Sequence, residues 1–477
     1  MTFSRLWAFL AVALPTLAAL IASLSTVDLA YQLRAGAQML DGHGIPALDT
    51  WTFTAAGVRW VDQQWGAQLA LAAVYRVAGW TGLVVLRAGL VAVIFACLFE
   101  IARRRGIGVR VAALLTLAAF VVAAPALALR PQLIGMALFA VVLLLVTDRR
   151  RHPGRLWLVP LVVVAWANIH GSFFLGPVVL GLAWLEDVHD RVPGARRTLA
   201  VALVSAAAAS LTPFGPAVWA YAVGLSTNPA VTARITEWQP TSLRDVPGLI
   251  FFASVLGVAA LIARSGRVTA WPTLAWLAVF AGIGAYAARG IAWWPLAAVP
   301  AVAAIMALDV PAPGSTPAAE RTGTPFTRRL NTGVAALFVV IGIVLLPAWR
   351  PIEPGLGSPV GVLVDAPAGI TAALRDLARP GDRLMNPQPW GSWFEFSVPD
   401  VTVSIDSRIE LFPVEVWQGH ERILAGDEGW AEQLGAWGVT LVVVTSLDAD
   451  ADARLTAAGW RTLFQDEAGS ILAAPGR

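Results

Sequence analysis

The sequence has 477 residues, of which 57% are hydrophobic and only 14% are charged, whereas about 25% of the residues in a soluble domain are charged. This composition excludes a soluble enzyme and predicts a polytopic membrane protein. Basic residues outnumber acidic ones by 34 to 31. Because the chain has no lysine and its arginines lie in short loops between apolar blocks, this charge indicates membrane topology and not nucleic-acid binding.

Eleven apolar blocks approach the length of about 20 residues that a helix needs to cross a bilayer. They are 6–25, 81–101, 109–127, 132–147, 156–172, 173–188, 198–213, 248–264, 269–287, 291–308 and 331–349. The first block also has a small-x-small site typical of signal peptides, Ser23-Leu24-Ser25, but its length and the closeness of Asp28 favour a retained span. Residues 65–78, interrupted by Gln68 and Arg76, are predicted to form a helix at the membrane interface.

Charge alternates between the loops, and the positive-inside rule places the arginine-rich loops in the cytoplasm. These loops carry Arg103, Arg104, Arg105, Arg110, Arg149, Arg150, Arg151, Arg155, Arg191, Arg196, Arg197, Arg264, Arg267, Arg321, Arg328 and Arg329. Arg5 places the N-terminus there too, and an odd number of spans places the C-terminus outside. We therefore expect a multi-pass protein of the inner (plasma) membrane, with a transmembrane domain at 1–350 and a soluble extracytoplasmic domain at 351–477.

The first outer loop, 26–80, carries an unusual set of acids for a membrane connector. Asp28 directly follows the first apolar block, an amphipathic run from Leu29 to Leu40 comes next, and Asp49 and Asp62 follow. A carboxylate at a membrane boundary is costly unless it is solvated, paired or used. Asp28 is the favoured catalytic candidate, against a role as a helix N-cap. A turn or cap role is slightly favoured for Asp49, and Asp62 is a second candidate acid.

The tail after about residue 351 has more charge, and its apolar runs shorten to the length of strands. The pattern predicts a small α/β domain. Its helices are expected at 366–378, 414–424, 430–437 and 449–458, and its strands at 383–386, 401–405, 439–445, 460–464 and 470–473. Aromatic faces at Trp390 and Trp393, together with Asp406-Ser407-Arg408-Ile409-Glu410, are candidates for binding a glycan. The alternative is that these tryptophans close the core of the domain.

Four further residues on the predicted outer face are candidates for substrate binding. Arg130 and Arg289 lie in tight turns between spans, where arginine suits phosphate, although an arginine at a span end also anchors to lipid headgroups. His170 could bind a sugar hydroxyl or relay a proton, or its ring could be satisfied by a neighbouring backbone group. Glu237 lies in a long loop, 214–247, that reads equally well as a lid or acceptor groove and as a surface loop.

Several segments resemble a known superfamily. Asp28 with its juxtamembrane helix, Ile45-Pro46-Ala47-Leu48-Asp49-Thr50-Trp51-Thr52-Phe53-Thr54 and Gln64-Trp65 are similar to multi-span glycosyltransferases of the GT-C type, especially bacterial relatives of protein mannosyltransferases (glycosyltransferase family 39-like). Leu129-Arg130-Pro131-Gln132, Trp166-Ala167-Asn168-Ile169-His170-Gly171, Trp390-Gly391-Ser392-Trp393 and Ile405-Asp406-Ser407-Arg408 resemble segments of bacterial membrane proteins near that superfamily. The resemblance therefore covers most of the chain.

The resemblance implies a GT-C-like fold and a transferase that passes a sugar from a polyprenyl-phosphate donor to an extracytoplasmic glycan, lipid or protein acceptor. An acid in the first outer loop would deprotonate the acceptor hydroxyl, and Asp28 matches that position. Some relatives use a divalent ion, which would be Mg²⁺ or Mn²⁺ with oxygen ligands, although no residues here have a diagnostic ligand spacing. Two alternatives remain: a lipid or polysaccharide transporter, and a non-catalytic assembly or binding protein.

Overall fold

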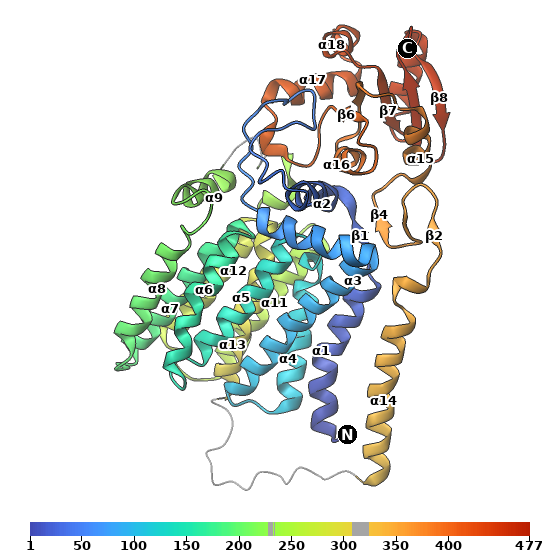
Figure 1. Ribbon diagram of the computed structural model, residues 1–477. Coiled ribbons are helices and arrows are strands. Elements are labelled where there is room, and N and C mark those ends of the chain that lie inside the picture. Colours follow the sequence, from blue (N-terminus) through green and yellow to red (C-terminus); the bar gives the residue numbers. More distant parts are fainter. Residues whose placement is uncertain (228–231, 233, 308–323) are drawn as a thin grey trace. The chain divides into compact units, whose positions relative to one another are not determined.

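The computed structural model describes residues 1–227, 232, 234–307 and 324–477, so Arg321 and part of the predicted 214–247 loop lie outside the described residues (Figure 1). The chain divides into two compact units. Unit 1 comprises Met1–Ala22 and Val84–Leu346, and unit 2 comprises Ser23–Leu83 and Pro347–Arg477. The predicted division put the first outer loop with the membrane domain, whereas in the structure this loop packs within unit 2.

Among the described residues of unit 1, all regular elements are helices. Its elements are α1 (Phe3–Ile21), the second part of α3 (Trp65–Arg104), α4 (Val109–Ala123), η1 (Ala124–Ala126), α5 (Pro131–Thr147), η2 (Pro153–Leu158), α6 (Val159–Ala167), η3 (Gly171–Phe174), α7 (Leu175–His189), α8 (Ala195–Ala208), α9 (Ala217–Thr227), η4 (Thr236–Trp238), α11 (Val246–Arg264), α12 (Trp271–Tyr286), η5 (Ala288–Ala292), α13 (Trp293–Ala307) and α14 (Pro325–Val344).

Each of the eleven apolar blocks contains a helix. Seven of the helices in the described part of the chain are long and apolar enough to cross a membrane, and three more apolar helices are shorter. The structure thus supports a multi-pass membrane protein, while the count of eleven spans and their orientation stay predictions. The backbone of α3 leaves the helical region at Gly79, where φ is 58° and ψ is −153°. This break separates the predicted interfacial helix from the span that follows it.

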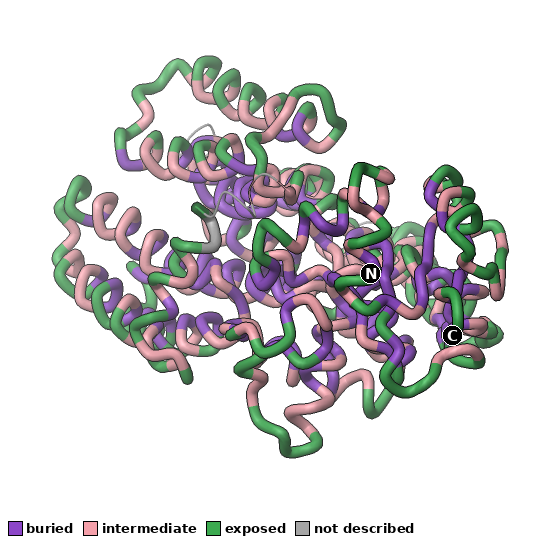
Figure 2. Tube along the Cα trace, turned by 90° about the horizontal axis from the view of Figure 1, so that it is seen from above, coloured by how far each residue is buried: buried purple, intermediate pink, exposed green. Residues whose placement is uncertain are grey.

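The core of unit 1 is built around α13, whose residues are buried almost without interruption from Trp293 to Ala303. Four aromatic rings meet there: Phe139 contacts Trp166, Phe280 and Trp293 at centroid distances of 6.0, 5.7 and 5.4 Å. In contrast, α14 has no buried residue. Along most other helices, buried and exposed positions alternate, as the purple and green segments of Figure 2 show.

Unit 2 contains a five-stranded sheet in the order β6-β5-β7-β9-β8. Strands β6, β5 and β7 run parallel to one another, and β9 pairs antiparallel with both β7 and β8. The strands are β5 (Asp382–Met385), β6 (Val401–Val403), β7 (Leu441–Thr445), β8 (Arg461–Gln465) and β9 (Gly469–Ala473). The helices are α15 (Ala368–Leu377), α16 (Gln388–Ser397), α17 (Val414–Ala425), α18 (Trp430–Trp437) and α19 (Ala449–Ala457), with η7 at Ile409–Leu411.

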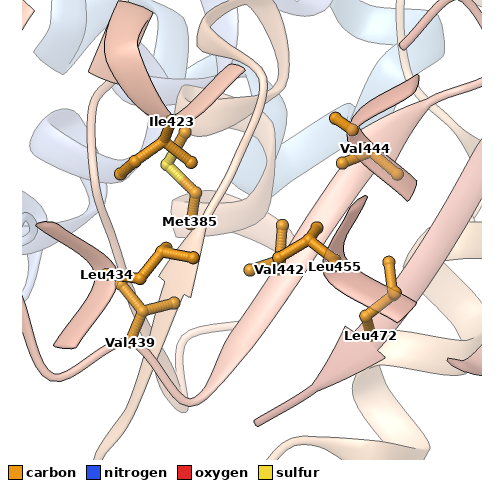
Figure 3. Packing of buried hydrophobic residues seen from close by; sticks show 9 residues of the cluster. Met385, Ile423, Leu434, Val439, Val442, Val444, Leu455 and Leu472 are labelled. Atoms are coloured by element: carbon orange, nitrogen blue, oxygen red, sulfur yellow. The ribbon is translucent and has the colours of Figure 1, made fainter. Parts of the chain in front are cut away.

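One face of this sheet is covered by helices. Met385, Val442 and Leu472 from three strands contact Ile423 and Leu455 from α17 and α19 in a buried cluster (Figure 3). Every strand and helix predicted for the tail is present. The sequence pattern missed α16, which carries Trp390 and Trp393, and two short pairs, β2 (Ile352–Glu353) with β3 (Ser358–Pro359) and β1 (Leu24–Ser25) with β4 (Leu363–Val364).

The first outer loop joins this domain through its own helix, α2 (Thr26–Leu40). Strand β1 pairs with β4 of the tail, and α2 lies against α16. Gly36 allows α2 to approach α3 closely, because a Cβ atom at this position would lie 2.1 Å from the carbonyl oxygen of Gln68. The structure confirms the predicted amphipathic face, because Leu29, Leu33 and Gly36 are all buried.

Candidate functional site

Two arginines of unit 1 line one cavity of about 240 Å³. Arg130 is the N-cap residue of α5, with Pro131 after it, and Arg289 lies in η5 between α12 and α13. Gln132 and Glu237 also line this cavity. The structure therefore brings together three of the residues predicted to bind substrate, from positions that are far apart in the sequence. We refer to this cavity as the arginine pocket.

The two arginines are held by a short segment of the 214–247 loop and by α5. Arg130 Nη1 donates a hydrogen bond to Glu237 Oε1 at 2.6 Å, and the Arg289 guanidinium lies 5.5 Å from the ring centroid of Trp238. Arg289 Nε donates to Gln132 Oε1, and Gln132 Nε2 donates to the Arg289 carbonyl oxygen, both at 3.3 Å. The arginine pocket thus has fixed donors and a net positive charge.

Glu237 is ionised in this setting. Burial raises its pKa, but the charges of Arg130 and Arg289 outweigh burial and hold the pKa below its ordinary value. Two cations facing one carboxylate leave one positive charge that a bound anion can neutralise. Arginine suits a phosphate because its planar fork donates two parallel hydrogen bonds to phosphate oxygens.

His170 lies next to this group of charges but has a structural partner. It caps η3, where its Nδ1 accepts a hydrogen bond from the Ser172 backbone N–H at 3.2 Å and lies 2.7 Å from Ser172 Oγ. Burial, and after it the charge of Arg289, lowers the pKa of His170 to about 3. The imidazole is therefore neutral at physiological pH. Because Nδ1 accepts, the proton lies on Nε2.

Asp49 is fully engaged in holding the first outer loop together. Its carboxylate accepts hydrogen bonds from the backbone N–H groups of Trp51 and Thr52 and from the Thr52 hydroxyl. It also accepts from Arg408 Nη2 at 2.8 Å, and both side chains are about 1% exposed or less. The turn role is thus the one that the geometry of Asp49 favours.

Arg408 is the centre of a buried charge cluster that joins the loop to the tail within unit 2. Its guanidinium bonds Asp406 and Asp49, lies 3.6 Å from Glu395, and lies over the rings of Trp51 and Trp60 at 4.4 and 4.6 Å. The pKa of the Arg408 guanidinium is raised, because the neighbouring carboxylates outweigh its burial.

Glu395 is a further carboxyl group of this cluster. Burial, followed by the charge of Asp406, raises the pKa of Glu395 well above its ordinary value and so favours its protonated form. Arg34 donates to the Glu395 carbonyl oxygen at 2.8 Å and lies over Trp51. The segment Asp406 to Arg408, which the sequence suggested as a glycan reader, is thus mostly buried in a structural role. Trp393 is likewise fully buried.

Asp62 is different from Asp49, because one of its oxygens is not hydrogen-bonded to any described residue. The other oxygen accepts from Gln68 Nε2 at 2.7 Å. Burial raises the pKa of Asp62 to about 7, a value suited to proton transfer near neutral pH. However, the residue is only 2% exposed, so a bulky acceptor does not reach it without movement of the surrounding side chains.

Asp28 lies in the first turn of α2 and is partly exposed. The N-cap of α2 is Ser25, so the capping role suggested by the sequence does not fall on Asp28. A carboxylate in a first turn is still favoured by the helix dipole. The charges of Asp28 and Glu410 repel each other, and the side chain of Glu410 is exposed. Asp28 therefore lies in an acidic, solvent-accessible region of unit 2.

The residues around these acids do not fit a divalent metal. Among the described residues, no group of three or more His, Cys, Asp or Glu side chains is arranged to hold an ion. Asp49 and Asp406 already bond the Arg408 guanidinium, and Glu395 tends toward its protonated form. We therefore derive no step through Mg²⁺ or Mn²⁺.

No protein-family model and no curated protein matches the sequence. In contrast, the fold is similar to that of a solved structure of the archaeal oligosaccharyltransferase AglB from Archaeoglobus fulgidus, in complex with an inhibitory peptide and a dolichol-phosphate. The match covers 100% of this chain and 74% of the AglB chain, with a TM-score of 0.60 and 13% sequence identity. ArnT from Cupriavidus metallidurans bound to undecaprenyl phosphate matches over 98% of both chains, with a TM-score of 0.52 and 16% identity. The chain therefore has a fold similar to that of these two solved structures.

Proposed function

We propose that the chain is a membrane glycosyltransferase that moves a sugar from a polyprenyl-phosphate donor to an acceptor hydroxyl outside the cytoplasm. The arginine pocket carries this proposal, because Arg130 and Arg289 line one cavity and present fixed cationic donors. The likeness to the two solved structures supports it, since these are described in complex with dolichol-phosphate and undecaprenyl phosphate.

In the proposed reaction, the two arginines bind the phosphate that leaves. A carboxylate removes the proton of the acceptor hydroxyl while the hydroxyl oxygen bonds the anomeric carbon and the bond from that carbon to the phosphate oxygen breaks. The configuration inverts, and the polyprenyl phosphate leaves with its negative charge held by the guanidinium groups. Gln132 orients Arg289 through the two hydrogen bonds between them.

Asp28 is our choice for the base. A positioned carboxylate contributes roughly a hundredfold or more to such a step, but it must reach the acceptor. Asp28 is partly exposed, whereas Asp62 is buried and Asp49 accepts four hydrogen bonds. Asp62, with its pKa near 7, is the second choice. His170 and Glu237 belong to the surroundings of the two arginines. His170 is neutral and lies beside Arg289, and Glu237 orients Arg130 through their ion pair.

Membrane extracts supplied with labelled polyprenyl-phosphate sugar test this proposal. Transfer should fall by about a hundredfold or more in Asp28→Asn and should be unchanged in Asp376→Asn, which replaces an exposed acid on α15 of the same unit. Arg289→Ala should raise the donor concentration needed for half-maximal transfer. If Asp28→Asn transfers sugar at the wild-type rate while Asp62→Asn is inactive, Asp62 is the base. Full activity in both variants would remove the proposed mechanism.

A further inference from the structure

A second cavity of unit 1 lies among the arginine-rich loops and plays no part in the proposed reaction. It has a volume of about 290 Å³ and is lined by the turn after α5, by η2, by the end of α7 with the loop after it, and by the start of α8. Its charged lining consists of Arg149, Arg150, Arg197 and Asp187. Helix α5 has 17 residues, so this cavity lies roughly 25 Å along the helix from Arg130. We refer to it as the basic cavity.

The carboxylate of Asp187 is already saturated by other groups. Arg149 donates to both of its oxygens, from Nε at 3.0 Å and from Nη2 at 2.8 Å. Arg150 Nε donates at 2.9 Å, and the Thr198 hydroxyl donates at 2.8 Å. Arg149 Nη2 also lies 2.8 Å from Glu186 Oε2. The charge of Arg149 is therefore neutralised, and Asp187 has no lone pair left for another cation.

Arg150 has a second acidic partner outside the cavity lining. Its Nη2 lies 2.8 Å from Asp190 Oδ2 and 3.8 Å from Glu186 Oε1. These contacts fix the position of the guanidinium at the wall of the cavity. Neither contact involves the third arginine of the lining.

Arg197 is that third arginine. Its side chain is exposed, lines the basic cavity, and forms no hydrogen bond or ion pair with any of the residues that the structure describes. It belongs to the first turn of α8, whose N-cap residue, Gly194, offers no capping side chain. The positive end of the helix dipole thus adds to the charge of Arg197.

We propose that the basic cavity binds a phosphate-bearing anion, with Arg197 as its main contact. Arg149 and Arg150 are paired with Asp187, Glu186 and Asp190, so the charge that remains for a ligand is that of Arg197. Arginine recognises phosphate oxygens through its fork of donors. The volume is at the lower end of ligand pockets, which begin at about 300 Å³, so it suits a headgroup and not a lipid tail. The positive-inside rule predicts that this end is cytoplasmic, where anionic phospholipids supply such groups.

The chain offers a matched pair of variants for the test. Arg196 and Arg197 are adjacent and both exposed, but only Arg197 lines the cavity. The full-length protein would be purified in detergent, and native mass spectrometry would count bound phosphatidylglycerol and phosphatidylcholine. Inorganic phosphate would be added as the second probe. Thermal melting would establish that both variants are folded, and Arg197→Lys would restore the positive charge.

We expect Arg197→Ala to lose about fivefold or more of the bound phosphatidylglycerol, Arg196→Ala to retain it, and Arg197→Lys to recover part of it. Phosphate binding that depends on Arg197, with no preference for phosphatidylglycerol, would support the site and identify a soluble anion as its source. Equal losses in Arg196→Ala and Arg197→Ala would show general surface attraction and overturn the proposal. Unchanged binding in Arg197→Ala would overturn it too.

Discussion

Replacing Arg408 with methionine should strongly destabilise unit 2. Arg408 is 1% exposed and bonds the buried carboxylates of Asp49 and Asp406, so its removal takes away the guanidinium that both of them contact. Removing one partner of a buried ion pair costs about 3–5 kcal/mol, and methionine replaces only part of the packing against the tryptophan rings. For a domain of this size, such a loss lowers the melting midpoint by about 6–20 °C.

The measurement is thermal melting of the full-length protein in detergent, with peptide-resolved hydrogen exchange to assign the loss to unit 2. Arg461→Met is the control, because Arg461 is exposed on β8. A midpoint within about 2 °C of the wild type would refute the reasoning.

Two further changes test the packing of the first outer loop. The folded pKa of Asp62 is raised to about 7, so its contribution to stability is present below its unfolded pKa and lost as pH rises through about 7. The melting midpoint of Asp62→Asn should therefore decline less than that of the wild type between about pH 5 and 8. Parallel pH profiles of the two proteins would contradict this. Gly36→Ala should destabilise by at least about 1 kcal/mol, since the new Cβ would meet the Gln68 oxygen at 2.1 Å. Gly435→Ala, which meets no atom within 4 Å, should be neutral or stabilising, and equal effects of the two would sink the argument.

Local patterns predicted most of the secondary structure because each helix and strand buries its own apolar face. The run Val439 to Thr445 became β7, and the apolar blocks became helices. Helix α16 was missed because Pro389 and Gly391 read as turn residues. Gly391 is in fact a contact point, where a Cβ would lie 2.0 Å from the Ile405 carbonyl oxygen. Tertiary packing overrides local propensity at such a position.

The candidate site could be predicted in part. Arg130 and Arg289 both occupy turns at span ends, and the positive-inside rule set them apart from the arginine-rich loops. Arg130 contacts Glu237 and Arg289 contacts the adjacent Trp238. No sequence signal predicts this, because two neighbouring loop residues contact arginines from two distant parts of the chain. The Asp49–Arg408 pair is equally invisible, since 359 positions separate its members. No periodicity links residues so distant in the chain.

Binding of undecaprenyl phosphate to the purified protein tests most directly the claim that the arginine pocket holds a lipid phosphate. The wild type, the double variant Arg130→Ala/Arg289→Ala and the control Arg264→Ala would be compared by native mass spectrometry over a series of lipid concentrations. We predict about tenfold or greater weakening in the double variant, and no change in the control, whose arginine is exposed at the end of α11. Wild-type affinity in the double variant would contradict the account.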